Sequence, residues 1–275
     1  MTLYPAYAKL NLTLDVLSRR EDGYHELDML NIRVTLADGI AFSPADTVDI
    51  AYENAPVAAG GTVQKAVEAY ARLAGRPYGA AVRVKKRIPA EAGLGGGSAD
   101  AAAVLNAMQA AYGALSDVAL YEAALSVGAD VPYCLQDAPC RVGGVGEKLV
   151  PLSPPRAPLW FVLVKPAAGV STAALFARLA LPVRHPQTER ALSSLESGDA
   201  EALGGLVQNA LQEAAAELIP EIGALSLALL RKGALGASMT GSGSAVFGLF
   251  ETEARARRAA QNLPGAAFVS VCRSL

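Results

Sequence analysis

The stretch of the sequence most restrictive for chemistry is a run of glycines that ends at a hydroxyl residue. Gly95, Gly96 and Gly97 stand directly before Ser98. Because glycine has no Cβ, backbone N–H groups along this run can approach a large anion, and a helix with Ser98 as its N-cap directs its positive end at the same place. The run therefore predicts a phosphate-binding loop at residues 93–98; a flexible turn that needs no ligand is the alternative interpretation.

Two familiar phosphate-binding motifs are absent. The chain contains no Gly-Lys dipeptide, which excludes the Walker A loop of P-loop NTPases. The glycines also do not form the G-x-G-x-x-G that follows the first strand of a dinucleotide-binding fold, so an NAD-dependent dehydrogenase is the weaker interpretation. The loop points to a nucleotide site of another kind.

Three further segments carry polar residues suited to substrate chemistry. Lys9 and Asn11, two residues apart on a predicted strand, point to the same side of it, although for the strand alone a solvated lysine is the ordinary interpretation. Asp130 follows a helix predicted at 117–127, whose dipole does not stabilise a carboxylate there, and both turn capping and catalysis are open as its roles. Residues 240–244 can form a hairpin turn or a loop that donates hydrogen bonds to a substrate.

Periodicity predicts the elements that position these segments. Leucines alternate with polar residues over 9–16, which predicts a strand with one buried face, and a second alternating stretch runs through 32–36. Apolar spacings of three and four predict helices over 62–74 and 99–112, the latter with Gly113 as its C-cap. The other elements are predicted as strands at 81–88, 159–164, 237–240, 245–250 and 268–272 and helices at 117–127, 222–232 and 252–263.

The second half of the chain has an order of elements typical of one known architecture. Prolines at 154, 155 and 158 place a domain boundary that divides the chain into 1–155 and 156–275. Beyond that boundary the predicted order is strand, helix, strand, strand, helix, strand, which is the ferredoxin-like pattern.

Composition excludes several classes of protein. With 24 Lys plus Arg against 26 Asp plus Glu, the net charge of −2 has the wrong sign for a protein that binds nucleic acid through its phosphates. The histidines, His25 and His185, lie far apart and the three cysteines show no C-x-x-C pair, so neither a metal site nor a disulfide scaffold is predicted. The sequence shows no signal peptide and no apolar run long enough to span a membrane, which predicts a cytoplasmic protein.

Four segments, in this order along the chain, together resemble the small-molecule kinases of the GHMP superfamily. They are AKLNL at 8–12, PAEAGLGGGSADAA at 89–102, GADVP at 128–132 and TGSGS at 240–244. The segment REDGYH at 20–25 is similar to one branch, which phosphorylates the 2-hydroxyl of a cytidine diphosphate-linked methylerythritol in the non-mevalonate pathway to isoprenoids. The resemblance implies an α+β fold with an N-terminal ATP-binding domain like domain 2 of ribosomal protein S5, a C-terminal ferredoxin-like domain, and an active site in the cleft between them.

The resemblance also implies roles for individual residues. Asp130 matches the catalytic base, and Lys9 the lysine that pairs with it and with the acceptor hydroxyl. The residues implied to bind ATP, with Mg²⁺ carried by its phosphates, are Pro89, Gly93, Leu94, Gly95, Gly96, Gly97 and Ser98. Those implied to bind the acceptor are Asn11 at its methylerythritol end, Tyr24, His25 and Phe176 around cytosine, and Gly241 and Ser242 in the second glycine loop. Without the resemblance, Phe176 is interpreted as a core residue of a helix.

The sequence departs from the family pattern at two places. Gly61 stands where many members have an asparagine near the adenine, and Ala99 replaces the second serine of the glycine motif. Adenine contacts are therefore not carried over, and any hydroxyl contact to phosphate or metal depends on Ser98. The alternatives are a sister kinase acting on homoserine or a mevalonate-type acceptor, and a nucleotide-binding protein without catalysis. The expected partners are small molecules, and the expected state is a monomer or weak homodimer.

Overall fold

The computed structural model describes residues 1–53, 60–179 and 187–275, which form two compact units. The first unit consists of Met1–Ala8, Leu36–Ile88 and Gly95–Asp137, and the second of Lys9–Thr35, Pro89–Leu94 and Ala138–Leu275. The long strands β1 (Thr2–Arg19) and β2 (His25–Ala45) each contribute residues to both units. These units have other borders than the predicted domains 1–155 and 156–275, and that division stays a prediction. His185 lies outside the described residues.

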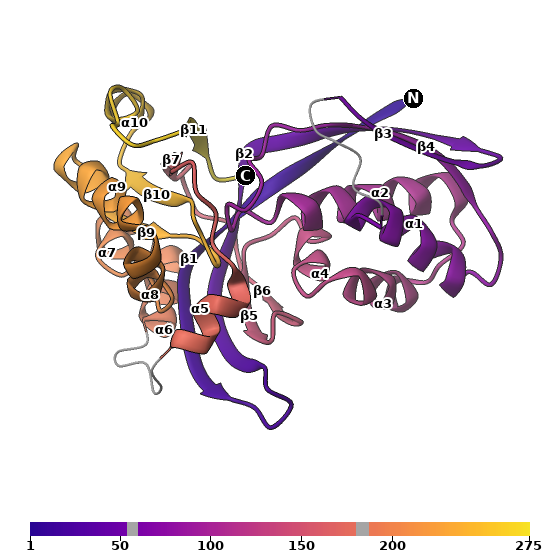
Figure 1. Ribbon diagram of the computed structural model, residues 1–275, viewed down its shortest axis with the longest axis horizontal. Helices are drawn as coiled ribbons and strands as arrows, with labels where there is room; N and C mark the ends of the chain where they lie inside the picture. Colours follow the sequence, from indigo (N-terminus) through magenta and orange to yellow (C-terminus); the bar gives the residue numbers. More distant parts are fainter. Residues whose placement is uncertain (54–59, 180–186) are drawn as a thin grey trace. The chain divides into compact units, whose positions relative to one another are not determined.

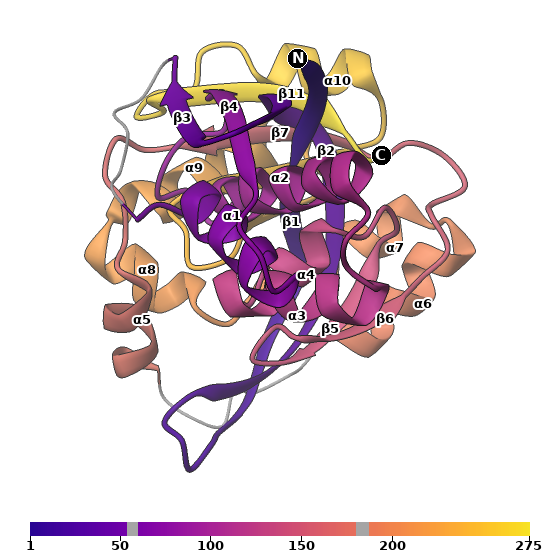
Figure 2. The same cartoon turned by 90° about the vertical axis from the view of Figure 1, so that its right-hand side faces the viewer.

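The first unit packs helices on a small sheet. Its further elements are β3 (Val48–Tyr52), α1 (Thr62–Leu73), β4 (Gly79–Lys85), α2 (Gly96–Tyr112), α3 (Asp117–Val127) and α4 (Val131–Cys134). The second half of β2 pairs antiparallel with β4, which pairs parallel with β3. Helices α1, α2 and α3 pack against one another below these strands (Figures 1 and 2), around fully buried side chains such as Tyr70, Val82 and Leu105.

Helix α2 differs from its prediction at one end. Gly113 is its C-cap with a φ of 57°, as predicted. The prediction of Ser98 as N-cap is wrong, because α2 begins at Gly96 after Gly95, whose φ is 68°. Glycine adopts this left-handed conformation without steric cost, so the chain enters the helix before it reaches Ser98, which lies inside the first turn.

The second unit contains the predicted ferredoxin-like arrangement. Its elements after β2 are β5 (Cys140–Gly144), β6 (Lys148–Pro151), β7 (Trp160–Lys165), α5 (Thr172–Arg178), α6 (Thr188–Ser197), α7 (Ala200–Gly204), β8 (Gln208–Asn209), α8 (Gln212–Leu218), α9 (Pro220–Arg231), β9 (Gly236–Met239), β10 (Val246–Phe250), α10 (Glu253–Ala259) and β11 (Phe268–Arg273). Four strands form an antiparallel sheet in the order β11-β7-β10-β9, with α9 packed against β9 and β10, and α10 against β7 and β10 (Figure 1).

The strand β1 is buried on both faces, so the predicted single buried face is wrong. The leucines of its apolar face are buried, but so are Thr13 and Asp15 on the polar face. Asp15 Oδ2 accepts hydrogen bonds from Thr188 N at 3.0 Å and Thr188 Oγ1 at 2.7 Å, and Thr13 Oγ1 lies 2.8 Å from Thr188 Oγ1. Buried polar groups are stable when they are hydrogen-bonded, and here the partner comes from a helix 173 residues further along the chain.

Within the described ranges, no helix combines the length and the apolar sequence that a membrane crossing requires.

Candidate active site

The glycine turn of the first unit consists of Gly95–Ser98 at the start of α2. Thr62 Oγ1 donates a hydrogen bond to the Gly97 carbonyl at 2.8 Å, and a Cβ at Gly97 would lie 3.2 Å from that same hydroxyl oxygen. Gly97 is exposed, and Gly96 and Ser98 are half-buried. Because the first N–H groups of a helix have no partner within it, the turn offers donors to an anion. This geometry supports the predicted phosphate loop.

Gly93 and Leu94, just before this turn, belong to the second unit. Gly93 lies against the loop at 240–244, which is the second glycine loop of the chain. The carbonyl of Leu94 accepts a hydrogen bond from Lys9 N at 3.0 Å. Gly93 has a φ of 68°, and a Cβ there would lie 2.0 Å from the Thr240 carbonyl oxygen. Gly241, with a φ of 55°, would place a Cβ 2.7 Å from the Gly93 carbonyl oxygen. The two backbones are so close that only glycine fits at either position.

The loop at 240–244 is also the hairpin turn between β9 and β10, as one of its two interpretations predicted. Thr240 N donates to the Ala245 carbonyl at 3.0 Å, which closes the hairpin. Thr172 Oγ1, at the start of α5, donates to Ser242 Oγ at 2.7 Å. Pro89, the first of the predicted ATP-binding residues, is half-buried in the segment that leads to Gly93.

Lys9 and Asn11 lie together on the polar face of β1, as their spacing predicted. Lys9 Nζ donates to Asn11 Oδ1 at 2.7 Å, and Asn11 Nδ2 donates to Asn31 Oδ1 at 2.7 Å. Thr240 Oγ1 accepts a hydrogen bond from Asn11 N at 3.0 Å, which ties the strand to the second glycine loop. Only 3% of Lys9 is exposed, so the solvated-lysine interpretation is wrong.

Asp130 stands between two helices of the first unit. It follows the end of α3, as predicted, but it is also the N-cap residue of the four-residue helix α4, where its carbonyl accepts from Cys134 N at 3.2 Å. The Asp130 carboxylate makes no capping hydrogen bond to α4. It therefore does not cap α4, although it stands at a helix start where a carboxylate is electrostatically favoured. Its pairing with Lys9 stays a prediction.

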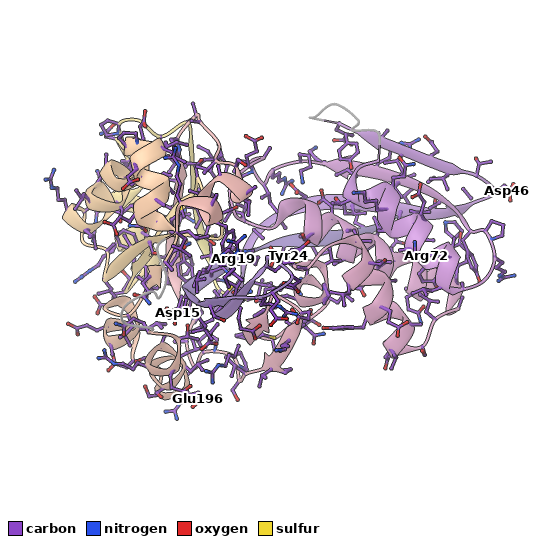
Figure 3. All side chains as sticks on the ribbon, turned by 60° about the horizontal axis from the view of Figure 1, so that its bottom comes forward. Asp15, Arg19, Tyr24, Asp46, Arg72 and Glu196 are labelled. Atoms are coloured by element: carbon purple, nitrogen blue, oxygen red, sulfur yellow. The ribbon has the colours of Figure 1, made fainter. Side chains whose placement is uncertain are left out.

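An aromatic pocket of about 800 Å³ in the second unit brings together three predicted residues, Tyr24, His25 and Phe176. Tyr24 lies in the turn after β1, His25 begins β2, and Phe176 lies on α5. The rings of His25 and Phe176 stack on each other, with centroids 4.7 Å apart and planes 23° apart. Tyr24 is 65% exposed, and Figure 3 shows it near Arg19. A planar base placed between His25 and Phe176 would have to part these two rings.

Arg19 is a pocket residue that the sequence reasoning missed. It lines the pocket from the end of β1, and among the described residues its guanidinium has no hydrogen-bond or ion-pair partner. Burial lowers the pKa of the His25 imidazole below its usual value, and the positive charge of Arg19 lowers it further. A neutral imidazole carries one donor and one acceptor, which suits the mixed edge of a cytosine. Arg19 is an even number of residues from Lys9, so strand periodicity could have placed it on the same face.

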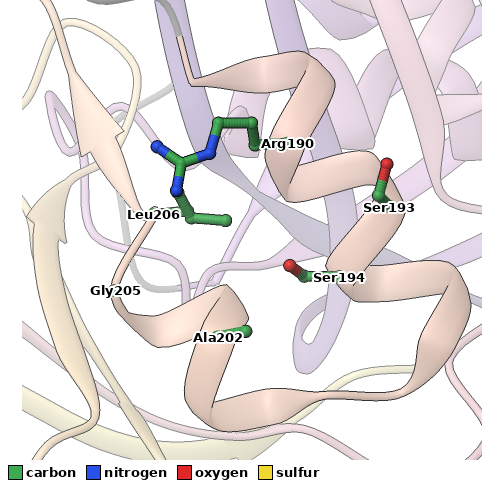
Figure 4. Close-up of a pocket in the computed structure, with 6 residues that line it drawn as sticks. All are labelled: Arg190, Ser193, Ser194, Ala202, Gly205 and Leu206. Atoms are coloured by element: carbon green, nitrogen blue, oxygen red, sulfur yellow. The ribbon is translucent and has the colours of Figure 1, made fainter.

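A second cavity, of about 430 Å³, lies between α6 and α7 in the same unit (Figure 4). Arg190, Ser193 and Ser194 line it, and Arg190 Nη1 donates to Gln187 Oε1 at 3.2 Å. None of the predicted site residues lines this cavity.

Comparisons with known proteins place the chain in one family. The family described as "GHMP kinases N terminal domain" matches residues 61–138, and that described as "GHMP kinases C terminal" matches residues 191–269. The chain is 40% identical to the 4-diphosphocytidyl-2-C-methyl-D-erythritol kinase of Carboxydothermus hydrogenoformans, over 96% of this chain and 94% of that protein. It is 41% identical to the enzyme of the same name from Pelotomaculum thermopropionicum, over 93% and 91%.

Solved structures agree with this assignment. A crystal structure of 4-(cytidine 5'-diphospho)-2C-methyl-D-erythritol kinase matches 99% of both chains with a TM-score of 0.86 and 36% identity. A homoserine kinase from Cytophaga hutchinsonii matches with a TM-score of 0.77 and 21% identity, which shows a common fold. The chain therefore belongs to the GHMP kinases, the ATP-dependent small-molecule kinases, and within them to the branch of the 4-diphosphocytidyl-2-C-methyl-D-erythritol kinases.

Proposed function

We propose that this kinase transfers the γ-phosphoryl group of ATP to the 2-hydroxyl of 4-diphosphocytidyl-2-C-methyl-D-erythritol, giving the 2-phosphate and ADP in the non-mevalonate pathway to isoprenoid precursors. The observation that carries the proposal is the pocket that joins Tyr24, His25 and Phe176. Acceptors such as homoserine and mevalonate have no nucleobase, so these aromatic side chains would have no common ligand to bind.

The glycine turn binds the ATP phosphates in this proposal. Gly95 starts the turn, and the N–H groups of Gly96, Gly97 and Ser98 are the donors. In the described residues no group of three or more His, Cys, Asp or Glu is arranged as a metal site, and the half-buried Ser98 supplies one hydroxyl. These residues fit a Mg²⁺ ion that arrives with ATP and needs few protein ligands. Bound with ATP, Mg²⁺ would neutralise part of the phosphate charge, and the Ser98 hydroxyl is the side-chain group of the turn that would help to hold it.

Asp130 and Lys9 carry the chemistry of the acceptor. Phosphoryl transfer to an alcohol requires a group that accepts the hydroxyl proton, and Asp130 takes this role. The Lys9 ammonium stabilises negative charge that develops on the acceptor oxygen. Lys9 is held by Asn11, whose side chain also hydrogen-bonds Asn31, so the lysine is positioned by a buried network. Asn11 then binds the methylerythritol end, next to the loop of Gly241 and Ser242.

The aromatic pocket binds the cytidine end of the acceptor. Tyr24 and Phe176 stack on the base, and the neutral imidazole of His25 hydrogen-bonds its polar edge.

Because its three cysteines, all of them described, form no disulfide, we place the enzyme in the cytoplasm, and we propose that it acts on small molecules as a monomer or weak homodimer.

A panel of acceptors tests this function. The purified kinase is assayed with Mg-ATP and the cytidine substrate, homoserine or mevalonate, and ADP formation is followed. We expect turnover with the cytidine substrate only, competitive inhibition by CMP and CDP, and no inhibition by uridine nucleotides of equal charge. Preference for an acceptor that lacks the cytidine group would reject the proposal in favour of a sister kinase. ATP binding without turnover of any acceptor would favour a nucleotide-binding protein.

A further inference from the structure

Three charged residues of the first unit form a buried cluster beside the glycine turn. Lys86 follows β4, Asp38 lies on β2 and Asp100 lies in the second turn of α2. Lys86 Nζ donates hydrogen bonds to Asp38 Oδ2 and, at 2.6 Å, to Asp100 Oδ2. Asp38 Oδ1 accepts from the backbone N–H groups of Arg87 and, at 2.8 Å, Ile88. We call Asp38, Lys86 and Asp100 the lysine clamp.

The lysine clamp contains two carboxyl groups and one amino group. The side chains of Asp38 and Asp100 are 0% and 3% exposed, and that of Lys86 is 20% exposed. Two buried carboxylates share one ammonium, and Asp100 Oδ1 has no hydrogen-bond partner among the described residues. A buried charge that is only partly compensated is unfavourable, so this arrangement needs a reason beyond stability.

The lysine clamp supports the turn that is proposed to bind phosphate. A Cβ at Gly96 would lie 3.0 Å from Ile88 Cγ2 and 3.5 Å from Lys86 Nζ, so the side chains of Lys86 and Ile88 lie against the first turn of α2. Through Asp100 the same lysine is bonded to the next turn of the helix. Asp38 fixes residues 87 and 88 by their N–H groups. The clamp thus joins β2, the end of β4 and the start of α2.

We propose that Asp38, Lys86 and Asp100 are positioning residues for ATP: Lys86 holds the first turn of α2 in its phosphate-binding geometry, and the charge on Asp100 sets how strongly that turn attracts phosphate. The inference rests on the proposed role of the glycine turn in binding ATP. None of the three residues needs to touch the nucleotide for this role.

The charge on Asp100 changes near neutral pH. Burial raises the pKa of the Asp100 carboxyl to about 7, although the Lys86 ammonium lowers it. Among the described residues, Tyr52 on β3 also interacts with Asp100, and burial and the charge of Asp100 raise the pKa of its hydroxyl. A proton gained by Asp100 removes a negative charge close to the N–H groups that receive phosphate, and its loss above pH 7 restores that charge. ATP binding is therefore expected to weaken as the pH rises through 7 and to be accompanied by proton uptake.

The variant Asp100→Asn tests the charge while it keeps the shape of the side chain. Binding of a non-hydrolysable ATP analogue with Mg²⁺ is measured by calorimetry at pH 6 and pH 8, in buffers of different ionisation enthalpy so that proton uptake is counted. We expect the variant to bind about threefold to tenfold more tightly than the wild type at pH 8 and equally at pH 6, without the extra proton uptake. The analogue itself also gains protons as the pH falls, but it does so equally with both proteins, so this contribution cancels in the comparison.

Asp49→Asn is the matched control, because Asp49 belongs to the same unit and forms an exposed ion pair with Arg83 at 2.6 Å. It is expected to behave as the wild type. Equal pH dependence and equal proton uptake in the wild type and Asp100→Asn would overturn the inference. Absence of analogue binding in the wild type would instead contradict the proposed function, and the inference with it.

Lys86→Met tests the positioning role in the assay of turnover. We expect the KM for ATP to rise about tenfold or more, while kcat and the KM for the acceptor change less than threefold, and Lys86→Arg to recover part of the ATP affinity. An unchanged KM for ATP in Lys86→Met would overturn the positioning role. If this variant does not fold, Lys86→Gln takes its place in the same assay, with the same expected and contradicting results.

Discussion

The glycine turn of the first unit and the aromatic pocket of the second unit are built by opposite means. The turn has almost no side chains of its own, and its backbone is held from outside by Thr62 and by the buried lysine clamp. The pocket is made of side chains, and two of them, His25 and Phe176, stack on each other. The turn is therefore shaped by groups outside it, whereas in the proposed function the pocket changes shape when the base parts the two rings. Substitutions in the turn should therefore leave acceptor binding unchanged, and substitutions in the pocket should leave ATP binding unchanged.

The largest effect is expected for Asp130→Asn in the first unit. The amide cannot accept the hydroxyl proton, so kcat should fall by roughly 10²-fold or more while ATP still binds. Steady-state turnover and binding of an ATP analogue measure the two effects. Unchanged turnover would remove Asp130 from the chemistry, and lost ATP binding would mean that the residue supports the nucleotide site rather than the reaction.

A smaller effect, confined to the acceptor, is expected for Phe176→Ala. Loss of the ring removes one stacking surface for the base, and the KM for the cytidine substrate should rise by about tenfold with the KM for ATP unchanged. Phe176→Tyr keeps the ring and should behave nearly as the wild type. If Phe176→Ala raised both KM values equally, the turn and the pocket would not be separable.

The smallest effect is expected for Arg19→Gln. Loss of the positive charge should move the pKa of His25 upward toward its usual value, because Arg19 contributes to lowering it. Imidazolium has no acceptor, so affinity for the cytidine substrate falls as the pH drops through the pKa of His25, and in Arg19→Gln this fall should begin at a higher pH. At pH 6 the difference in KM should be about twofold or less.

Proton NMR measures the titration of His25 directly, since the chain has two histidines and His25→Asn assigns the signal. Arg190→Gln is the control, an arginine that lines the cavity between α6 and α7 of the same unit. If the titration of His25 is the same in wild type and Arg19→Gln, the arginine does not act on the imidazole.

Elements whose evidence is local were predicted well. The helices at 62–73 and 117–127 follow from apolar residues spaced by three and four, and the strands of the ferredoxin-like sheet from short apolar runs. The single buried face of β1 was wrong because the partners of its polar residues come from distant segments, such as Thr188. The start of α2 was predicted too late in the sequence, because a glycine in the left-handed conformation can precede a helix just as a serine N-cap can. Helix α4 is too short for periodicity to reveal.

The candidate site was predicted in part. Spacing placed Lys9 beside Asn11, and the family resemblance selected Tyr24, His25 and Phe176, which share one pocket. The lysine clamp could not be predicted, because its two ion pairs join residues 48 and 14 positions apart and a lysine at a strand end is usually solvated. Long-range pairing of this kind leaves no periodic trace in the sequence.

The division of the chain between the two units has a consequence for its synthesis. The first unit is complete once the ribosome has made Asp137, and domains generally fold as they emerge. The segment Lys9–Thr35 leaves the ribosome early, yet it belongs to a unit whose largest part, Ala138–Leu275, is made last. Until residue 188 appears, Asp15 lacks the hydroxyl and amide that it binds in the finished protein. In the nascent chain, Asp15 and the residues around it therefore have to stay hydrated after residues 1–8 of the same strand have folded into the first unit.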